Sequence, residues 1–493
     1  MSAKTDPLPA DRPGNFESFA GQHELSAILD RQRAAFLANG PPDARQRKDN
    51  LARLRAAVLA QRSELADAIN ADFGSRSRYE TEIMEVVPVI QAIDYYRKKL
   101  RRFMKPERRH VALPYRFGRA YVELQPKGVI GIMAPWNYPF SLVMVPLITA
   151  LAAGNRAMIK PSELTPRTGE VIGRMLAAVF APEDVAVVLG GAEVGAAFSE
   201  LAFDHILFTG STQVGRKVMR AASENLVPLT LELGGKSPAV IARGAVNRQT
   251  VSSVAFGKLA NGGQTCVAPD YALVHANDLD AFIAAFSDAA AHLYPGGPDN
   301  RDYASIINER HFERLHRLLD DARTRGARLI EIGVGPNRAP KRPYTIVPTL
   351  VIGADDNTGV MTEEIFGPIL PVRTYQTMDE AIAYINARPR PLALYYFGER
   401  NADCAKLLKR TTSGNVGINN TLLHVAIDDL PFGGVGPSGM GAYHGIEGFR
   451  SMSHAKGVFI QARWNLPGLL RPPYRKVADL AISLILGKRR ASK

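Results

Sequence analysis

Cysteine is scarce in this sequence: its 493 residues contain only Cys266 and Cys404. Two cysteines can form at most one disulfide, so no disulfide framework holds the fold together, and a reducing compartment such as the cytoplasm is the simple expectation. No stretch reaches the roughly 18 consecutive apolar residues of a membrane-spanning helix. Residues 1–22 lack the apolar core of a secretory signal and are rich in Pro, Asp, Gly and Ser, so we expect a mobile leader there.

Several catalytic signatures are also missing. The ten histidines show no metal-ligand spacing, and the sequence contains neither a CxxC pair nor a GxSxG nucleophile elbow, so we expect no metal site and no serine acyl transfer. A GxGxxG pattern at residues 434–439 follows no apolar strand and therefore lacks the context of a dinucleotide fingerprint. A glycine-rich loop near the substrate or at a subunit contact is the better interpretation.

Positive charge is unevenly distributed. Residues 97–119 hold ten Lys or Arg against one acid, and residues 463–493 hold eight against one, so the rest of the chain is slightly acidic despite the net charge of +13. Anionic lipid, an acidic patch on a second subunit and plain solvent all suit such segments. Neither segment has the aromatic residues interleaved with basic ones, or the fold signature, of a nucleic-acid module, so we expect no nucleic-acid partner.

The chain does have the apolar content, 46%, and the length for two or three domains. Apolar residues at helical spacing dominate residues 23–110. From residue 129, short apolar runs alternate with helical segments, and a second alternation starts near residue 248. This pattern predicts an α/β protein with doubly wound parallel sheets. Between the two regions, residues 119–128 resemble a short hairpin with Pro126 and Gly128 near its turn.

Polar residues follow the predicted strands at the ends where ligands bind in such sheets. Asn137 follows 129–133 within the braced turn "APWNYPF", and a fixed side-chain amide can donate to an oxyanion. Lys160 and Glu163 follow the next strand, where they form either a ribose contact or a surface ion pair. Gly210 and Ser211 open a strand–turn–helix that suits a pyrophosphate or is an ordinary turn.

Two further residues supply reactive groups. Glu232 lies between apolar residues at a strand end, where burial would raise its pKa and make it a base near neutral pH, although a structural salt bridge is equally compatible. Cys266, in "GGQTC", has small neighbours that leave room for a ligand. Cys404 lies among Ala and Leu on a predicted helix, as an inert packing residue does. Cys266 is therefore the candidate nucleophile.

These motifs, together and in this order, resemble the NAD(P)-dependent aldehyde dehydrogenase superfamily. The matching segments are "APWNYPF", "IKPSE", "FTGSTQVG", "LELGGKSP", "GGQTCVAP", "EEIFGPI", "GNVGIN" and "PFGGVGPSGMGAYHG", which span about two-thirds of the chain. The wording around the cysteine and the last motif is most similar to the class 3 branch, which includes coniferyl and fatty aldehyde dehydrogenases. That branch implies a hydrophobic substrate, either aromatic such as coniferaldehyde or long-chain aliphatic.

The resemblance implies a role for each candidate. Cys266 matches the nucleophile that forms a thiohemiacetal and then a thioester, Asn137 the oxyanion donor, and Glu232 the base that activates water. It also implies NAD as cofactor, with NADP as an alternative, and the matching contact residues are Pro135, Trp136, Lys160, Glu163, Gly210, Ser211, Gly215, Glu364 and Phe366. Tyr138, Met144 and Phe432 are expected to line the path of an apolar substrate.

The resemblance also implies an architecture and a homodimer. We expect a Rossmann-like NAD-binding domain from residues 23–110 and 129–231, and a catalytic domain from 232–420. Residues 111–128 and 421–463 would form a bridging and oligomerisation element with a closing segment. The basic tail, 464–493, would contact a membrane peripherally or pack on the partner subunit. Two alternatives stay open: an acylating enzyme that passes the thioester to coenzyme A, and an idle scaffold that only binds cofactor or membrane.

Overall fold

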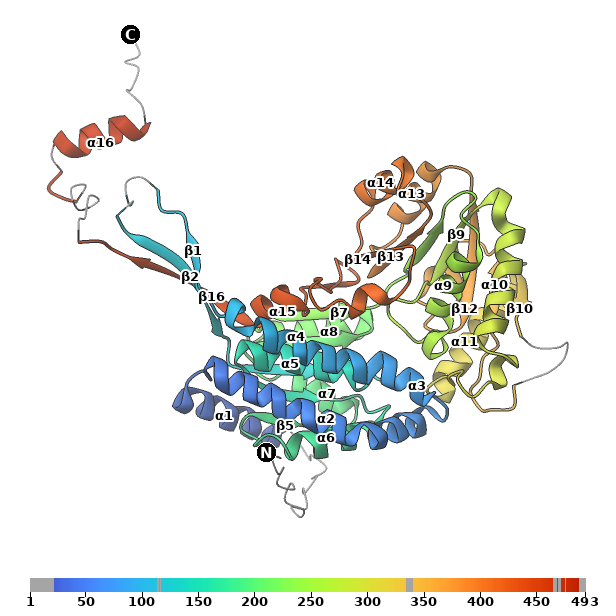
Figure 1. Ribbon diagram of the computed structural model, residues 1–493, viewed down its shortest axis with the longest axis horizontal. Coiled ribbons are helices and arrows are strands. Elements are labelled where there is room, and N and C mark those ends of the chain that lie inside the picture. Colours follow the sequence, from blue (N-terminus) through green and yellow to red (C-terminus); the bar gives the residue numbers. More distant parts are fainter. Residues whose placement is uncertain are drawn as a thin grey trace, which may run out of the picture.

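The computed structural model describes residues 22–112, 115, 117–333, 340–463, 468, 471–474 and 476–486. The leader predicted for residues 1–22 lies outside this part of the chain, except for Gln22. The described strands form three sheets. Figure 1 shows two α/β bodies, each built on one large sheet, and a small third sheet that projects from them toward α16 (Lys476–Leu486).

The first large sheet has the strand order β15-β7-β6-β3-β4-β5 and is parallel except for β15, which runs antiparallel to β7. Its central strands are continuous apolar runs, as expected when helices cover both faces of a parallel sheet. The five strands predicted between residues 129 and 233 are all present. Their bounds are β3 (Val129–Met133), β4 (Arg156–Lys160), β5 (Val185–Val187), β6 (His205–Gly210) and β7 (Leu229–Leu233), and β15 is Gly439–Met440.

Helices from the start of the chain and from between the strands cover this sheet. α2 (Ala44–Phe73) begins with a capping box between Asp43 and Gln46. Gly74 caps its end with a φ of 73°, the left-handed value that favours glycine. A π-helical turn, η1 (Glu82–Val86), separates α3 (Arg78–Thr81) from α4 (Val87–Phe103). The other helices are α1 (Gln22–Asn39), α5 (Ser141–Ala153), α6 (Pro166–Ala177), α7 (Ala192–Ser199) and α8 (Thr212–Ser223).

The second large sheet has the order β10-β11-β12-β9-β8-β13-β14 and is parallel apart from the edge strand β10. Its strands are β8 (Pro238–Ile241), β9 (Tyr271–His275), β10 (Arg328–Glu331), β11 (Thr349–Ile352), β12 (Ile369–Tyr375), β13 (Ala393–Phe397) and β14 (Asn415–Ile418). The strand predicted over residues 344–353 is shorter than expected, because β11 begins only after Pro348, which cannot donate to a ladder.

Helices also surround the second sheet. They are α9 (Arg248–Leu259), η3 (Ala260–Gly263), η4 (Ala276–Asp278), α10 (Leu279–Leu293), η5 (Gly297–Asp299), α11 (Glu309–Thr324), α12 (Gly359–Thr362), α13 (Met378–Asn386) and α14 (Ala402–Arg410). After β14 the chain returns to the first body through η6 (Leu423–Ala426), β15 and α15 (Gly445–Ser451), and α15 packs on α5 and α4. The two bodies are therefore joined twice, once after β7 and once before β15.

The third sheet has the order β1-β2-β16 and is antiparallel. The hairpin predicted in residues 119–128 is wrong. Those residues form one strand, β2 (Arg119–Pro126), which pairs with β1 (Glu107–Arg109) on one side and with β16 (Ser453–Ile460) on the other. Residues 127–128 then lead directly into β3. A Pro–Gly turn signal cannot distinguish a hairpin from a change of sheet, because both need a sharp bend of the chain.

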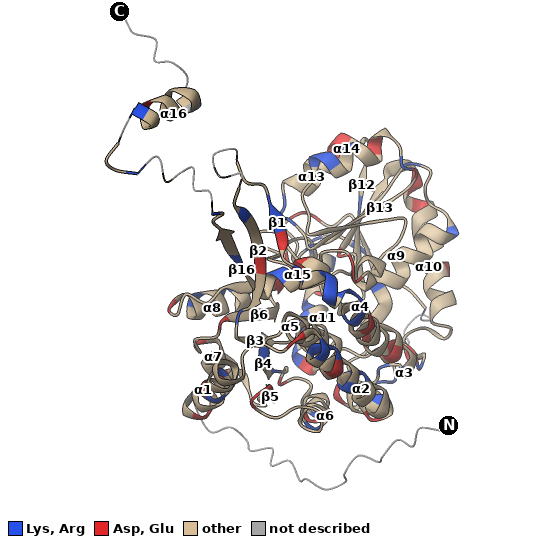
Figure 2. Cartoon of the chain, turned by 60° about the vertical axis from the view of Figure 1, so that its left-hand side comes forward, with Lys and Arg blue, Asp and Glu red and all other residues tan. Residues whose placement is uncertain are grey.

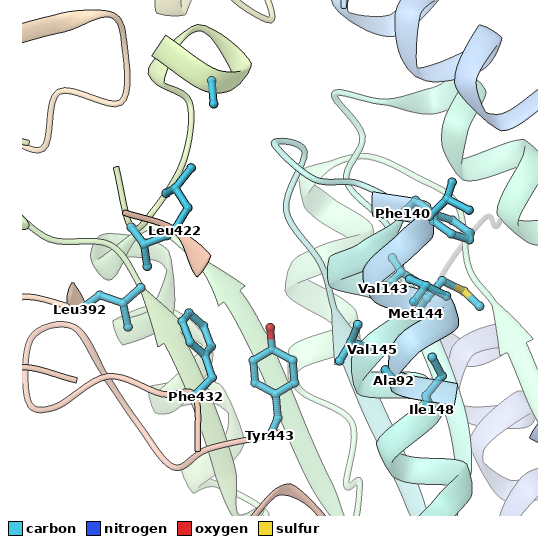
Figure 3. Packing of buried hydrophobic residues seen from close by; sticks show 14 of the residues in the cluster. Ala92, Phe140, Val143, Met144, Val145, Ile148, Leu392, Leu422, Phe432 and Tyr443 are labelled. Atoms are coloured by element: carbon cyan, nitrogen blue, oxygen red, sulfur yellow. The ribbon is translucent and has the colours of Figure 1, made fainter. Parts of the chain in front are cut away.

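One large hydrophobic core runs from the N-terminal helices through α5 into the second body. Figure 3 shows Val145 on the side of α5 that faces Leu392, Phe432 and Tyr443, which come from the second body and the returning segment, whereas Phe140 and Met144 project to the other side. All of these residues belong to the same buried cluster. Met144 and Phe432 are buried in this core. The packing fixes α5, and therefore the loop that precedes it, against both bodies.

Charged residues of both signs are spread along the outer helices, and Lys and Arg occur at β1 and near α15, beside the projecting sheet (Figure 2). Glu107 of β1 pairs there with Arg109 and Arg450. In the described part of the tail, α16 exposes Val477, Leu480, Ile482, Leu484 and Leu486. Among the described residues, every helix is too short or too polar to cross a lipid bilayer.

Candidate active site

Residues from both large sheets line one cavity of about 230 Å³. The first sheet contributes residues at or after the ends of β3, β6 and β7, and the second body contributes Cys266, Glu364 and Phe366. The lining residues are Pro135, Trp136, Asn137, Thr209, Gly210, Ser211, Glu232, Leu233, Gly234, Cys266, His311, Arg314, Glu364 and Phe366. Nine of the twelve predicted site residues are among them; Lys160, Glu163 and Gly215 are not.

Cys266 lies in a turn between α9 and β9, after three consecutive residues with left-handed backbone angles. Asn261, Gly262 and Gly263 have φ values of 52°, 59° and 77°, and a Cβ on Gly263 would lie 2.3 Å from the carbonyl oxygen of Gly367. Glycine at this position is therefore required both by its backbone angle and by space. The small residues before the cysteine let the chain turn sharply and bring the thiol to the cavity.

Burial, together with the neighbouring carboxyl groups of Glu364 and Glu232, raises the pKa of the Cys266 thiol to about 12. The backbone N–H groups of Cys266 and Val267 act in the opposite direction, because they hydrogen-bond the sulfur. These donors can also stabilise an oxygen anion that forms next to the sulfur. The arrangement suits a nucleophilic thiol beside an oxyanion site.

Glu232 is buried on β7, with 3% of its surface exposed. Neither carboxyl oxygen has a hydrogen-bond partner among the described residues, and burial raises its pKa well above the usual range. Its neighbour across the ladder is Gly439 of β15, where a Cβ would lie 2.0 Å from the Leu231 carbonyl oxygen. Among the described residues no salt bridge holds Glu232, so its carboxyl is buried without a partner and its pKa is raised by burial alone.

Asn137 is equally buried, with 3% of its surface exposed. Its side-chain Nδ2 donates to the backbone carbonyl of Gln264 at 3.1 Å, which leaves a second N–H of the same amide available. Its own backbone carbonyl accepts from Asn261 Nδ2 at 2.9 Å and from Arg76 Nη1 at 3.2 Å. The amide is therefore tied to the loop that carries Cys266.

The remaining predicted residues divide into cavity walls and neighbours. Ser211 is the N-cap of α8, and its Oγ accepts from the Val214 N–H at 3.3 Å. Gly215, one turn into α8, is buried where a Cβ would lie 2.6 Å from Leu233, so it packs closely on β7, and its predicted cofactor contact stays a prediction. Lys160, the last residue of β4, places its Nζ 3.5 Å from a carboxyl oxygen of Glu163 and also donates to the Pro161 carbonyl.

Glu364 and Phe366 form the wall contributed by the second body. Burial, and then the charge of Asp270, raise the pKa of Glu364 to about 8, while the Gly235 N–H, Lys236 and Arg314 lower it. A Cβ on Gly234 would lie 1.9 Å from a Glu364 carboxyl oxygen, so the glycines after β7 give this carboxylate its space.

An aromatic group closes the cavity near Trp136. The Trp136 ring packs edge-on against Phe366, with ring centroids 5.3 Å apart, and lies 5.1 Å from His311. The sequence reasoning missed His311 and Arg314, which lie on the first turns of α11. Arg314 donates to the backbone carbonyls of Glu364, at 3.2 Å, and Ile365. Their spacing of three on one predicted helix was the available signal, but nothing in the sequence placed that helix at the cavity.

The structure also shows where Cys404 and the glycine-rich segment 434–439 lie. Cys404 is buried on α14 within an apolar cluster and is not among the residues that line the cavity. The glycine-rich segment 434–439 runs into β15 and packs against β7 rather than following a strand into a helix. Tyr138, Met144 and Phe432 are buried and do not line this cavity, so the substrate path that they were expected to form stays a prediction.

Comparison with known proteins identifies the fold and the family. Residues 6–458 match the aldehyde dehydrogenase family. A probable coniferyl aldehyde dehydrogenase of Pseudomonas aeruginosa is 50% identical over 454 residues, 92% of this chain and 94% of that protein. A coniferyl aldehyde dehydrogenase of a Pseudomonas species is 45% identical and covers 94% of this chain and 97% of its own. Mouse aldehyde dehydrogenase family 3 member B2 is 36% identical over 96% of this chain and 97% of its own, in agreement with the class 3 resemblance.

Solved structures with a similar fold are also aldehyde dehydrogenases. The substrate-bound state of Staphylococcus aureus AldH has a TM-score of 0.87 and 38% identity, and the match covers 93% of this chain and 99% of that one. An NAD+ complex of an aldehyde dehydrogenase from Bacillus cereus has a TM-score of 0.81 and 25% identity, with 90% and 89% covered. The chain belongs to the aldehyde dehydrogenase family, and it is an NAD(P)-dependent enzyme that oxidises an aldehyde to the carboxylic acid.

Proposed function

We propose that the enzyme oxidises a hydrophobic aldehyde, with an aromatic aldehyde such as coniferaldehyde as the preferred class, and that Cys266 is its nucleophile. The observation that carries this proposal is the single cavity shared by Cys266, Glu232 and Asn137. The names of the relatives that are about half identical to this chain support the aromatic substrate.

Each step assigns one residue to one bond change. The Cys266 thiolate adds to the aldehyde carbon, and the carbonyl oxygen becomes an anion. The backbone N–H of Cys266 and the Asn137 amide donate to that anion. When the anion reforms the carbonyl, a hydride leaves the carbon and the thioester remains on Cys266. Glu232 then takes a proton from water, the water oxygen bonds the acyl carbon, and the carbon–sulfur bond breaks to release acid and thiol.

The cavity walls fit a nicotinamide dinucleotide. The N-terminus of α8, capped by Ser211, favours a diphosphate, and the rings of Trp136 and Phe366 form an apolar wall. We assign cofactor contacts to these residues together with Pro135, Gly210, Gly215, Glu364, Lys160 and Glu163. When bound, the cofactor supplies the hydride acceptor. The half-exposed Glu163 carboxylate repels a 2′-phosphate, so we propose NAD as the preferred form.

Finer features of the assembly complete the proposal. We assign residues 23–110 and 129–231 to cofactor binding, 232–420 to catalysis, and 111–128 with 421–463 to bridging and closure. The exposed edge strand β16 suits pairing with a second copy in a homodimer. We propose that the apolar face of α16 and the basic residues around it contact a membrane surface peripherally in the cytoplasm, where Cys266 stays a free thiol.

NADH formation, followed by absorbance, tests the proposal with coniferaldehyde, benzaldehyde and hexadecanal as substrates. We expect turnover with all three and the highest kcat/KM with coniferaldehyde. Turnover only in the presence of coenzyme A would show that the thioester passes to coenzyme A and is not hydrolysed by water. Cofactor binding without NADH formation from any aldehyde would leave the idle scaffold as the better explanation.

A further inference from the structure

A buried ion pair lies beside the catalytic loop but outside the cavity. Arg76 follows α2, and Glu85 is in the π-helical turn η1. Arg76 Nη1 donates to Glu85 Oε1 at 2.7 Å, and neither side chain has any exposed surface. Burying two charges costs several kcal/mol per ion unless their bonds compensate, so a fully buried pair is weak support for a purely stabilising role. Single-turn π-helical bulges also occur frequently at functional sites.

The pair holds the loop of Asn137 from both ends. Arg76 Nη1 donates to the Asn137 carbonyl at 3.2 Å. Glu85 Oε2 accepts the N–H groups of Phe140, at 2.8 Å, and Ser141, at 3.1 Å. Burial raises the pKa of the Glu85 carboxyl, whereas the groups bonded to it, Arg76 and the two loop N–H groups, are all donors and lower it. One ion pair thus fixes a peptide carbonyl at residue 137 and two peptide N–H groups three and four residues later.

Stacking fixes the guanidinium itself. Its Cζ lies 5.0 Å from the centroid of the Phe73 ring and 4.9 Å from that of Tyr138. Its Nε and Nη2 have no hydrogen-bond partner among the described residues, so Nη1 alone makes the polar contacts. Tyr138 in turn shares a hydrogen bond of 2.7 Å with Thr265 Oγ1, next to the nucleophile. A planar guanidinium between two rings is held more rigidly than a lysine ammonium would be.

The same N-terminal segment reaches the cysteine loop. Glu80 accepts the backbone N–H of Asn261, whose Nδ2 donates to the Asn137 carbonyl at 2.9 Å. The Asn137 carbonyl therefore has one donor from the ion pair and one from the loop before Cys266. Residues 76–85 connect the two loops that carry the proposed oxyanion donor and the proposed nucleophile.

We propose that Arg76 and Glu85 are positioning residues, which hold the side-chain amide of Asn137 in the place where it donates to the oxyanion. This inference rests on the proposed role of Asn137. The loop from 134 to 140 has no regular helix or strand of its own, so its backbone orientation depends on these contacts. Donors aimed at a developing charge act only when their geometry is fixed beforehand, and a misplacement of about 1 Å can cost roughly 10²-fold in rate.

The main test removes both charges at once, because removal of one would leave the other buried and unpaired. In Arg76→Met/Glu85→Gln, the Gln carboxamide can still accept a loop N–H, but the bond to the Asn137 carbonyl is lost. We expect kcat to fall by about 10²-fold, while the KM for NAD changes far less, because only Pro135 and Trp136 of the assigned cofactor contacts lie on this loop. Arg76→Lys keeps the charge, so we expect its kcat to fall by less than that of the double variant. If the double variant does not fold, the kcat of Arg76→Lys is measured in its place.

A matched control and a mutant cycle separate positioning from general destabilisation. Arg47→Met removes another buried arginine that donates to backbone carbonyls, those of Pro42 and Ala152, and should leave kcat unchanged. In an Asn137→Ala background, the loss of the ion pair should cost less than about threefold further, because the group that it positions is gone.

Each outcome has one meaning. Equal losses in both backgrounds, or an unchanged kcat in a folded Arg76→Met/Glu85→Gln enzyme, would overturn the positioning role and leave the proposed function intact. An unchanged kcat in Asn137→Ala alone would overturn the oxyanion assignment, and the positioning role with it.

Discussion

The two large sheets present opposite edges to the same cavity. In the first sheet, Asn137, Gly210 and Glu232 lie at or just after the carboxyl ends of β3, β6 and β7. In the second sheet, Cys266 precedes β9 and Glu364 precedes β12, so both lie at amino ends. Ligands in open parallel sheets usually bind at the carboxyl edge. The first sheet follows this rule. The second sheet instead supports, at its amino edge, the two turns that carry Cys266 and Glu364 to the cavity.

The carboxyl edge of the second sheet has a hollow of its own. Arg243, Arg400, Asn401 and Asn419 are among the residues that line this polar space of about 670 Å³, beyond β8, β13 and β14. None of its lining residues is shared with the cavity at Cys266. We therefore expect that substitutions at the amino edge of the second sheet abolish the reaction and that substitutions at its carboxyl edge leave it unchanged.

The largest effect is expected at the amino edge. Cys266→Ala removes the only proposed nucleophile and should lower kcat by at least about 10⁴-fold, as the loss of a nucleophile does in other acyl-transfer enzymes. Binding of NAD, measured by calorimetry, should persist, because the cofactor walls remain. Measurable turnover in this variant would show that the second sheet does not deliver the essential group.

The second prediction concerns the ionisation of that group. Since burial and two carboxyl groups raise the pKa of Cys266 to about 12, its thiolate fraction in the cofactor-free enzyme should rise by about tenfold per pH unit from pH 6 to 9. Alkylation by iodoacetamide, followed by mass spectrometry, should accelerate by about 10³-fold over that range. A plateau near pH 7 would contradict this, and Cys266→Ala reports any background labelling of Cys404.

Glu232→Gln tests the carboxyl edge of the first sheet. If Glu232 activates water, its loss should slow thioester hydrolysis by about 10²-fold or more, while acylation continues. The variant should release about one NADH per enzyme in a burst and accumulate an acyl-enzyme adduct visible by mass spectrometry. Normal steady-state turnover would remove Glu232 from the mechanism.

The same variant should also change stability, with a sign set by linkage. Because the pKa of Glu232 is raised in the folded enzyme, the folded state keeps a proton that the unfolded chain loses, so stability falls as pH rises from the unfolded pKa toward the folded one. Gln carries no such penalty. The Tm of Glu232→Gln minus that of the wild type should therefore grow between pH 5 and pH 8, by a few degrees. A difference that shrinks with pH would show that Glu232 is stabilised as a carboxylate.

The smallest effect is expected at the carboxyl edge of the second sheet. Arg243→Ala and Arg400→Ala alter exposed side chains around the separate hollow, so kcat and both KM values should stay within about twofold of the wild type. A larger loss would mean that this edge communicates with the cavity at Cys266, and the comparison between the two sheets would have to be revised.

The sequence was sufficient for much of the fold and the site. The apolar runs from 129 to 233 predicted the strands of the first sheet, because a parallel strand buried on both faces must be continuously apolar. Polar residues that follow such runs predicted where Asn137, Gly210 and Glu232 would meet. Cys266 could be singled out because small neighbours around a thiol differ from the aliphatic neighbours of Cys404.

Other features were decided only by the tertiary structure. The strand that ends at Pro126 pairs with β1 and with β16, more than 300 residues further along the chain, which no local turn signal encodes. His311 and Arg314 reach the cavity because α11 packs beneath the loop of Glu364, and helical spacing cannot reveal that.

The sequence by itself thus determined the candidate catalytic groups and placed Asn137, Gly210 and Glu232 at strand ends of the first sheet, since residue type and local periodicity are short-range properties. Tertiary structure decided how these groups are held: the Arg76–Glu85 pair, the unpartnered burial of Glu232 and the use of opposite sheet edges. Each of these depends on contacts between segments far apart in sequence, where burial and distance set the electrostatics.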